Sequence, residues 1–110
     1  TNHQHKYAIA DYQRAIELKP DYLDAYYQRG CSHQNLGNLS AAVADFSRAI
    51  EIDPRYAPAY YQRGKVHAQI GDGAGAIGDY HQAANLYLDR GDSKTYQQIL
   101  AILDRLVGRG

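Results

Sequence analysis

A chain of 110 residues has the length of one domain and can bury only a modest hydrophobic core. Its 12 basic residues balance its 12 acidic residues, and the resulting zero net charge argues against a nucleic-acid partner, which normally requires a positively charged surface. No apolar run approaches the ~20 residues that span a bilayer, so we expect no membrane insertion.

The cysteine content and the start of the chain bear on its cellular context. Cys31 is the single cysteine, which excludes an internal disulfide and is compatible with a reducing compartment such as the cytoplasm. The chain begins with Thr1 and contains no Met, so we expect it to be a segment of a longer protein. The absence of a signal peptide therefore carries little weight.

The first two expected helices are separated by a proline turn. Residues 3–18 have apolar residues at helical spacing, and Pro20 ends this helix because proline disfavours helix in the residue before it. Asp21 or Asp24 is the expected cap of the second helix, and Gly37 follows its last turn as a C-cap. The apolar face of the first helix consists of Ala8, Ile9, Tyr12, Ala15 and Ile16.

The third and fourth expected helices follow the same pattern of punctuation. Ser40 is the expected cap of the third helix, and Pro54 closes it. Pro58 falls in the first turn of the fourth helix, where a missing N–H group is harmless, and Gly71 ends that helix.

The fifth expected helix, over residues 74–89, is the weakest because Gly75 and Gly78 lie inside it. Replacing either glycine with alanine should therefore stabilise the protein. Ser93 is the expected cap of a sixth helix that runs to about Val107. Its apolar stripe consists of Tyr96, Ile99, Leu100, Leu103, Leu106 and Val107.

An internal repeat runs through these helices, since the stretch from Ala8 to Gly30 recurs from Ala42 to Gly64. The string Ala-Tyr-Tyr-Gln-Arg-Gly is identical in both copies, and a weaker third copy begins at Ala76. The offset is the same between successive copies, and repetition at a fixed period of this length indicates a solenoid of stacked helical units.

The period and the residues that recur resemble the tetratricopeptide repeat family, whose unit is a helix–turn–helix of about 34 residues. The resemblance implies an all-α fold, a right-handed α-α superhelix of about six antiparallel helices. It divides the chain into a half-repeat helix (1–20), two repeats (21–54 and 55–90) and a C-terminal capping helix (91–110). The matching positions are Tyr26, Gly30, His33, Ala42, Phe46, Ala49 and Pro54, then Tyr60, Gly64, His67, Ala76, Tyr80 and Ala83, preceded by Ala8, Tyr12, Ala15 and Pro20.

Three features depart from the family pattern. Arg29 and Arg63 stand where the family prefers leucine, and His33 and His67 stand where it prefers an aromatic residue. Leu88 replaces the proline that should close the last repeat. At Gly30 and Gly64 the resemblance implies close packing, with a neighbouring helix backbone leaving no room for a Cβ atom.

Charged residues also recur at fixed repeat positions. Arg29 and Arg63 each precede a packing glycine, and Asp11, Asp45 and Asp79 share one position. Because a buried arginine requires a carboxylate partner, we expect these residues to form arginine–aspartate pairs between helices. The alternative is that the two arginines bind a carboxylate of a ligand.

No constellation of catalytic, cofactor-binding or metal-binding residues is evident, so we do not expect an enzyme. His33 and His67 are one repeat apart, too far to share a metal ion, and are interpreted as packing residues. Cys31 has no identifiable catalytic partner, and the glycine-rich stretch 71–75 lacks both the preceding strand and the lysine of a phosphate-binding loop.

The resemblance further implies a concave surface lined by the first helix of each repeat. The lining positions are Asp24, Tyr27, Cys31, Gln34 and Asn35 in one repeat and Pro58, Tyr61, Lys65, Ala68 and Gln69 in the next. In a subset of the family, a clamp of Lys, Asn and Arg on this surface binds the C-terminal carboxylate of heat-shock chaperones, but Tyr27 and Cys31 stand where that clamp has Lys and Asn. The surface therefore suits peptide backbone and apolar side chains, although Tyr27 and Tyr61 could equally serve inter-repeat packing.

The function implied by the resemblance is a non-catalytic scaffold that binds a protein or peptide partner in this groove. Two alternatives stay open. One is weak homo-oligomerisation through the exposed apolar faces of the first and last helices. The other is a catalytic domain elsewhere in a longer protein.

Overall fold

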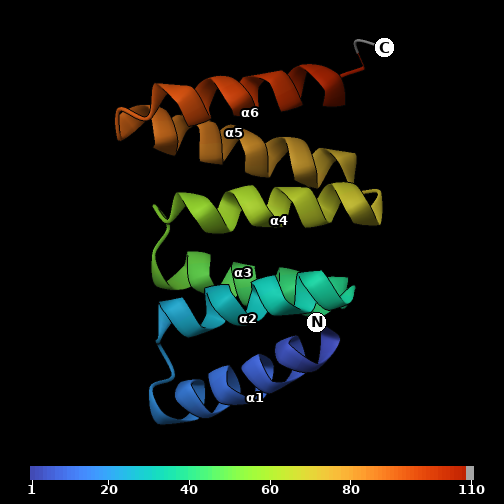
Figure 1. The fold of residues 1–110 in the computed structure, drawn as a ribbon. Helices are drawn as coiled ribbons and strands as arrows, with labels where there is room; N and C mark the ends of the chain where they lie inside the picture. The colour runs from blue at the N-terminus through green and yellow to red at the C-terminus, as the bar shows by residue number, and fades with distance from the viewer. Residues whose placement is uncertain (109–110) are drawn as a thin grey trace. The chain divides into compact units, whose positions relative to one another are not determined.

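The computed structural model describes residues 1–108, which form six α-helices joined by short turns (Figure 1). The helices are α1 (Asn2–Leu18), α2 (Leu23–Leu36), α3 (Leu39–Ile52), α4 (Ala57–Ile70), α5 (Gly73–Asp89) and α6 (Ser93–Leu106). Helices α1–α3 form one compact unit that ends at Pro54, and α4–α6 form a second unit that begins at Arg55. Among the described residues, no helix is both long enough and apolar enough to cross a membrane.

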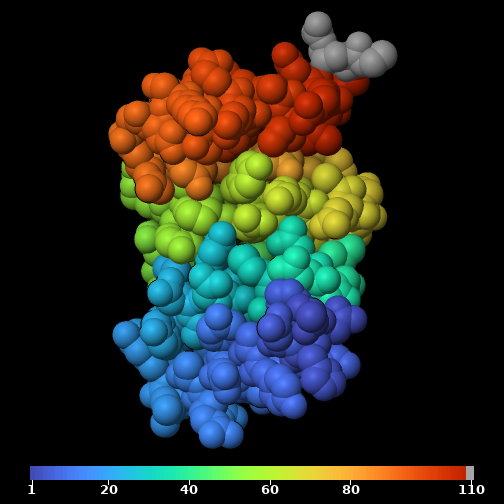
Figure 2. All heavy atoms as spheres, viewed as in Figure 1, coloured from blue at the N-terminus to red at the C-terminus, as the bar shows by residue number. Residues whose placement is uncertain are grey.

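In the first unit, α2 packs against both α1 and α3. The buried core of this unit consists largely of small side chains around the Phe46 ring. These small residues are Ala25, Ala42 and Ala49. Helix α1, by contrast, has no fully buried residue, and it forms part of the surface of this unit (Figure 2).

In the second unit, α5 packs against both α4 and α6. The apolar stripe expected in the sixth helix contributes Ile99 and Leu103, which are buried against the alanines of α5. Helix α6 thus covers a face of α5, the packing role expected of a capping helix.

Glycine and proline mark the helix ends as expected. Gly37 and Gly71 follow α2 and α4 with φ of 82° and 96°, left-handed conformations that glycine adopts without strain. Pro58 lies in the first turn of α4.

The expected N-terminal caps are wrong at three helices. Helix α2 starts after Tyr22 and α3 after Asn38, and neither residue makes a side-chain cap hydrogen bond. The Asn38 N–H instead donates to the His33 carbonyl at 2.8 Å, so the turn after α2 leads directly into α3, and Ser40 already lies inside it. At α6, the Asp92 carboxylate accepts from the Thr95 N–H at 3.1 Å, which places the cap one residue before Ser93. Hydrogen bonding from the Thr95 side chain and from the Thr95 backbone N–H lowers the pKa of Asp92.

The close packing expected at the two mid-helix glycines is confirmed, but the neighbour is a side chain rather than a helix backbone. A Cβ atom on Gly30 would lie 2.7 Å from the Phe46 ring. A Cβ atom on Gly64 would lie 3.3 Å from both Asp79 Cβ and the Tyr80 ring. Because each glycine lacks a side chain, the aromatic ring of the following helix can pack directly against it.

The two interior glycines of α5, Gly75 and Gly78, differ from each other. A Cβ atom on Gly78 would meet nothing within 4 Å, which agrees with the expected gain from alanine. A Cβ atom on Gly75 would instead lie 2.9 Å from Asp72 Cγ, because the Asp72 carboxylate caps α5 by accepting from the Gly75 N–H. The expected gain from Gly75→Ala is therefore corrected, since the substitution displaces a helix cap.

Candidate peptide-binding surface

Five of the predicted site residues lie along α2. Asp24 and Asn35 are exposed, whereas Tyr27, Cys31 and Gln34 are half-buried. Spacings of three, four and seven positions place these residues on one side of a helix. The Asn35 side-chain amide donates to the Cys31 carbonyl at 3.0 Å, so the end of this surface is fixed to the helix backbone.

The other predicted site residues lie on α4, in the second unit. Lys65 and Gln69 are exposed, and Tyr61 is half-buried. The Lys65 ammonium lies 5.6 Å from the centre of the Tyr61 ring, within the range of a cation–π interaction. Helix α4 thus presents a positive charge beside an aromatic ring, and its equivalent on α2 presents Cys31 beside Tyr27.

Both site tyrosines also contribute to packing. The Tyr27 ring lies 5.7 Å from the ring of Phe46, and the Tyr61 ring lies 5.8 Å from that of Tyr80, measured between centroids. Each ring therefore has one side held by the following helix, and its partial exposure leaves another part accessible. This arrangement is compatible with both of the roles considered for these residues.

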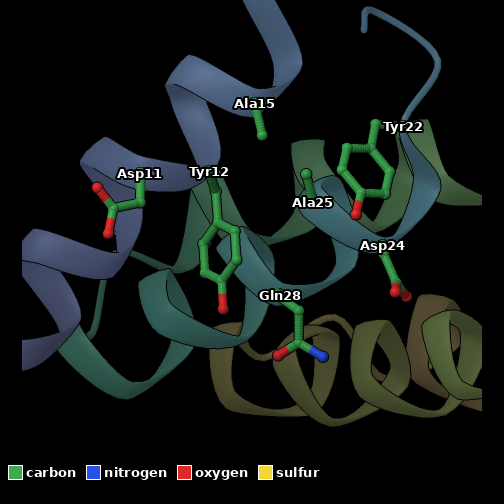
Figure 3. A pocket seen from close by; sticks show the side chains of 7 residues that line it. All are labelled: Asp11, Tyr12, Ala15, Tyr22, Asp24, Ala25 and Gln28. Atoms are coloured by element: carbon green, nitrogen blue, oxygen red, sulfur yellow. The ribbon is translucent and has the colours of Figure 1, made fainter. Parts of the chain in front are cut away.

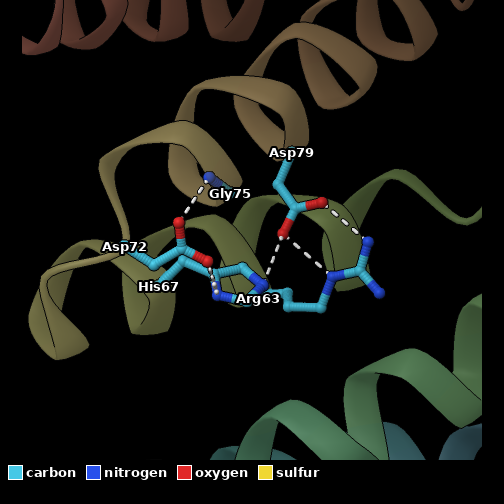
Figure 4. Close-up of polar contacts among 5 residues, drawn as sticks. All are labelled: Arg63, His67, Asp72, Gly75 and Asp79. Atoms are coloured by element: carbon cyan, nitrogen blue, oxygen red, sulfur yellow. Dashed lines mark hydrogen bonds and ion pairs between the residues drawn. The ribbon is translucent and has the colours of Figure 1, made fainter.

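The arginine–aspartate pairs are present, one in each unit. Arg63 donates from Nε to Asp79 Oδ2 at 2.9 Å and from Nη2 to Oδ1 at 2.7 Å (Figure 4). Arg29 makes the same two bonds to Asp45, at 2.8 and 2.7 Å. These hydrogen bonds raise the pKa of both arginines, and they engage both guanidinium groups inside the protein. The geometry supports a structural role rather than the alternative of ligand binding.

His67 extends the second pair into a small polar cluster. Its Nδ1 lies 3.4 Å from Asp72 Oδ2 and its Nε2 lies 3.5 Å from Asp79 Oδ2 (Figure 4). The equivalent His33 contacts the Asn38 amide at 3.3 Å instead. Within residues 1–108, no group of three or more His, Cys, Asp or Glu residues could hold a metal ion.

A cavity of about 290 Å³ between α1 and α2 was not predicted from the sequence. The Tyr12 and Tyr22 rings flank it, and Ala15 and Ala25 lie between them (Figure 3). Asp11, Asp24 and Gln28 complete the lining. One of these residues carries a repeat signal, because Asp11 belongs to the same aspartate series as Asp45 and Asp79.

Comparison with known proteins identifies the helical repeat. The family profile described as TPR repeat matches residues 4–37 and 35–71. No curated protein sequence matched the chain.

Several solved structures have a similar fold. PcrH, in complex with the chaperone binding region of PopD, has a TM-score of 0.90 at 20% identity over 96% of this chain and 80% of its own. The TPR2B domain of yeast Sti1, in a complex with pHsp70, has a TM-score of 0.87 at 20% sequence identity. The match covers 97% of this chain and 86% of the Sti1 chain. The type III secretion translocator chaperone SycD of Yersinia enterocolitica has a TM-score of 0.88 at 15% sequence identity. The match covers 94% of this chain and 72% of the SycD chain. These matches confirm the all-α tetratricopeptide-type fold.

Proposed function

Because the chain belongs to the tetratricopeptide repeat family, we propose that it is a non-catalytic recognition module that binds a partner's peptide segment through the accessible faces of α2 and α4. The proposal is carried by one observation: each of the two helices, taken in its own unit, carries at repeat-equivalent positions a half-buried tyrosine beside exposed polar residues. Such faces can repeat a similar contact along an extended or helical peptide. The division of the chain into repeats at 21–54 and 55–90 belongs to the same proposal.

The related structures support this class of function. PcrH is described with a region of PopD, Sti1 TPR2B with pHsp70, and the first TPR domain of Spaghetti (RPAP3) with an HSP90 peptide. In this chain Tyr27 and Cys31 replace the lysine and asparagine of a carboxylate clamp. We therefore propose that the partner is recognised through backbone groups and apolar side chains, and that a free C-terminal carboxylate is dispensable.

Selection from a library of displayed peptides, followed by measurement of affinity for the purified chain, tests the proposal. Lys65→Glu reverses the charge on the α4 face and should weaken binding of the selected peptide by up to about fivefold, since exposed charged contacts are worth up to ~1 kcal/mol. Lys6→Glu makes the same change on exposed α1 and is the matched control. If the selected peptide binds both variants and the original chain with equal affinity, α4 is not part of the binding surface.

Self-association is the second candidate, favoured by the absence of any buried residue in α1. Leu18 is 84% exposed and Tyr7 is 68% exposed, and at the other end Val107 is 57% exposed. Covering a few hundred Å² of apolar surface would contribute several kcal/mol before the cost of association, at ~25 cal/mol per Å². Sedimentation over a concentration series should then show weak association that Ile9→Glu abolishes, whereas a groove binder alone stays monomeric.

A further inference from the structure

We propose that the second unit binds an acidic segment of a partner protein, whose Asp and Glu side chains contact Lys65, Arg90 and Arg105. The half-buried rings of Tyr61 and Tyr87 lie among these cations and contact an apolar side chain of the same segment. These five residues are called the cationic surface below. The inference rests on the proposed function, because it names the chemistry of the partner segment that α4 binds.

The two units of the chain carry opposite net charges. Residues 55–110 contain seven basic and five acidic residues, a net charge of +2, whereas residues 1–54 contain five basic and seven acidic residues, a net charge of −2. The zero net charge of the whole chain therefore combines a negative unit with a positive one. A positive surface attracts acidic segments and favours their association, most strongly at low salt.

Internal contacts engage the acidic side chains of the second unit and leave most of its cations unpaired. Ion pairs with two arginines and the caps of α5 and α6 engage four of the five carboxylates, which are Asp72, Asp79, Asp89 and Asp92. Asp104 is the fifth. Four cations of this unit form no ion pair with any of residues 1–108, and these are Lys65, Arg90, Lys94 and Arg105.

The fold itself does not require a cation at position 65. Lys65 is exposed in the middle of α4, and its repeat-equivalent residue on α2 is Cys31. Arg90 follows α5 and Arg105 lies in the last turn of α6, where a positive charge also interacts favourably with the helix dipole. Lys65 is therefore the cation of this surface that helix stability does not account for, and a carboxylate of the partner supplies a reason for it.

Tyrosine rings connect Lys65 with Arg90. The Lys65 ammonium lies 5.6 Å from the centre of the Tyr61 ring, and the Arg90 guanidinium lies 5.3 Å from the centre of the Tyr87 ring. Burial raises the pKa of Tyr87, and the Tyr61 hydroxyl adds to this rise, so the two tyrosines lie within electrostatic range of each other. The two cation–tyrosine pairs therefore belong to one region of the unit.

A third tyrosine connects Arg105 with the same region. The ring of Tyr80 lies 5.8 Å from that of Tyr61, measured between centroids. Burial raises the pKa of Tyr80 to about 12, and the positive charge of Arg105 opposes this rise, so Arg105 lies within electrostatic range of the Tyr80 hydroxyl. Helices α4, α5 and α6 thus each place one cation around a group of tyrosines.

The number and spread of the cations indicate what the segment must carry. One exposed ion pair changes an affinity by at most about fivefold, so a segment needs two or three acidic side chains to bind through this surface. The tyrosine rings among the cations offer apolar area at a low cost in conformational entropy, which suits one apolar side chain of the segment. A nucleic acid fits less well, because its phosphates require a more strongly basic surface than a net charge of +2 provides.

Selection from a library that displays random internal segments identifies the partner chemistry without a free C-terminal carboxylate. The selected peptides should carry two or more Asp or Glu residues beside an apolar residue. The leading peptide is synthesised with both ends blocked, together with a neutral copy in which Asn and Gln replace Asp and Glu. Fluorescence anisotropy should show that the neutral copy binds about tenfold more weakly and that added salt weakens only the acidic peptide, since salt screens exposed charges.

Removal of charges from the protein locates the contact. The test variant carries Lys65→Gln, Arg90→Gln and Arg105→Gln, and it should bind the acidic peptide about tenfold more weakly and the neutral copy within about twofold of the original chain. The matched control carries Lys6→Gln, Arg14→Gln and Lys19→Gln. It removes three exposed positive charges from the first unit and should leave both affinities within about twofold. Circular dichroism verifies that both triple variants are folded.

Three outcomes would overturn this inference while the proposed function stays intact or changes partner. Selected peptides that lack acidic residues would make the partner neutral, and an acidic peptide that binds both triple variants equally would place its carboxylates elsewhere. A single-stranded oligonucleotide that binds more tightly than the acidic peptide, and is lost in the test variant, would make a nucleic acid the partner. A selection that yields no binding peptide would instead overturn the proposed function, and this inference with it.

Discussion

Replacing Arg63 with leucine tests whether the arginine–aspartate pairs stabilise the fold. Leucine is the residue that the family prefers at this position, so the substitution would be favourable if the local environment were the ordinary one. Here it removes both hydrogen bonds to Asp79, whose side chain is only 7% exposed. The remaining neighbour is His67, whose Nε2 lies 3.5 Å from the carboxylate.

The expected cost lies between two known cases. Breaking a fully buried ion pair costs roughly 3–5 kcal/mol, and an exposed pair is worth about 0–1 kcal/mol. The Arg63 side chain is 21% exposed, so we expect a loss of about 1–3 kcal/mol. For a domain of this size the melting temperature should fall by at least about 4 °C.

Chemical denaturation followed by circular dichroism measures this loss. A double variant, Arg63→Leu with Asp79→Leu, should recover most of it, because the stranded carboxylate is gone. Arg55→Gln is the matched control, since the Arg55–Asp89 pair is 3.4 Å apart with side chains 70% and 61% exposed. An Arg63→Leu protein as stable as the original, or a double variant no better than the single one, would refute the reasoning.

Three glycine substitutions test the packing, and a fourth substitution tests the dependence of stability on alkaline pH. Gly78→Ala should raise the free energy of unfolding by about 0.4–1 kcal/mol, and Gly75→Ala should give no such gain, as measured in the same denaturation assay. Gly30→Ala should cost about 1–3 kcal/mol because its Cβ atom would overlap the Phe46 ring, and a neutral result would contradict that packing. Burial raises the pKa of Tyr80 from 10.0 to about 12, so the folded state holds this proton more tightly; the stabilisation is complete below pH 10 and is lost as the pH rises through about 12. Tyr80→Phe should therefore flatten the loss of stability in this pH range, and an unchanged alkaline profile would assign the loss to other groups.

The helix register could be predicted because two independent signals agree. The constant offset of the repeat aligns the apolar positions, and Pro20, Pro54, Gly37 and Gly71 punctuate the turns. The arginine–aspartate pairs were predictable for a related reason. Both the arginine and the aspartate recur at the same repeat positions, so the sequence indicates the same contact in two repeats.

The features that were missed depend on atoms that no residue pattern specifies. The starts of α2 and α3 are set by backbone hydrogen bonds in the turns, so a search for capping side chains selected the wrong residues. The steric conflict that an alanine at position 75 would create depends on where the Asp72 carboxylate lies. The cavity beside Tyr12 depends on how side chains of two helices fill the space between them. The peptide-binding role of Asp24, Tyr27, Cys31, Gln34, Asn35, Tyr61, Lys65 and Gln69 stays a prediction.

The accessible faces of α2 and α4 are proposed to bind a peptide, and amide chemical-shift mapping during titration with a library-selected peptide tests this central claim most directly. We predict saturating shift changes centred on Cys31, Gln34 and Asn35 of α2 and on Lys65 and Gln69 of α4, at one peptide per chain. Changes confined to α1, α3 or α6, with those five amides unmoved at saturation, would contradict it.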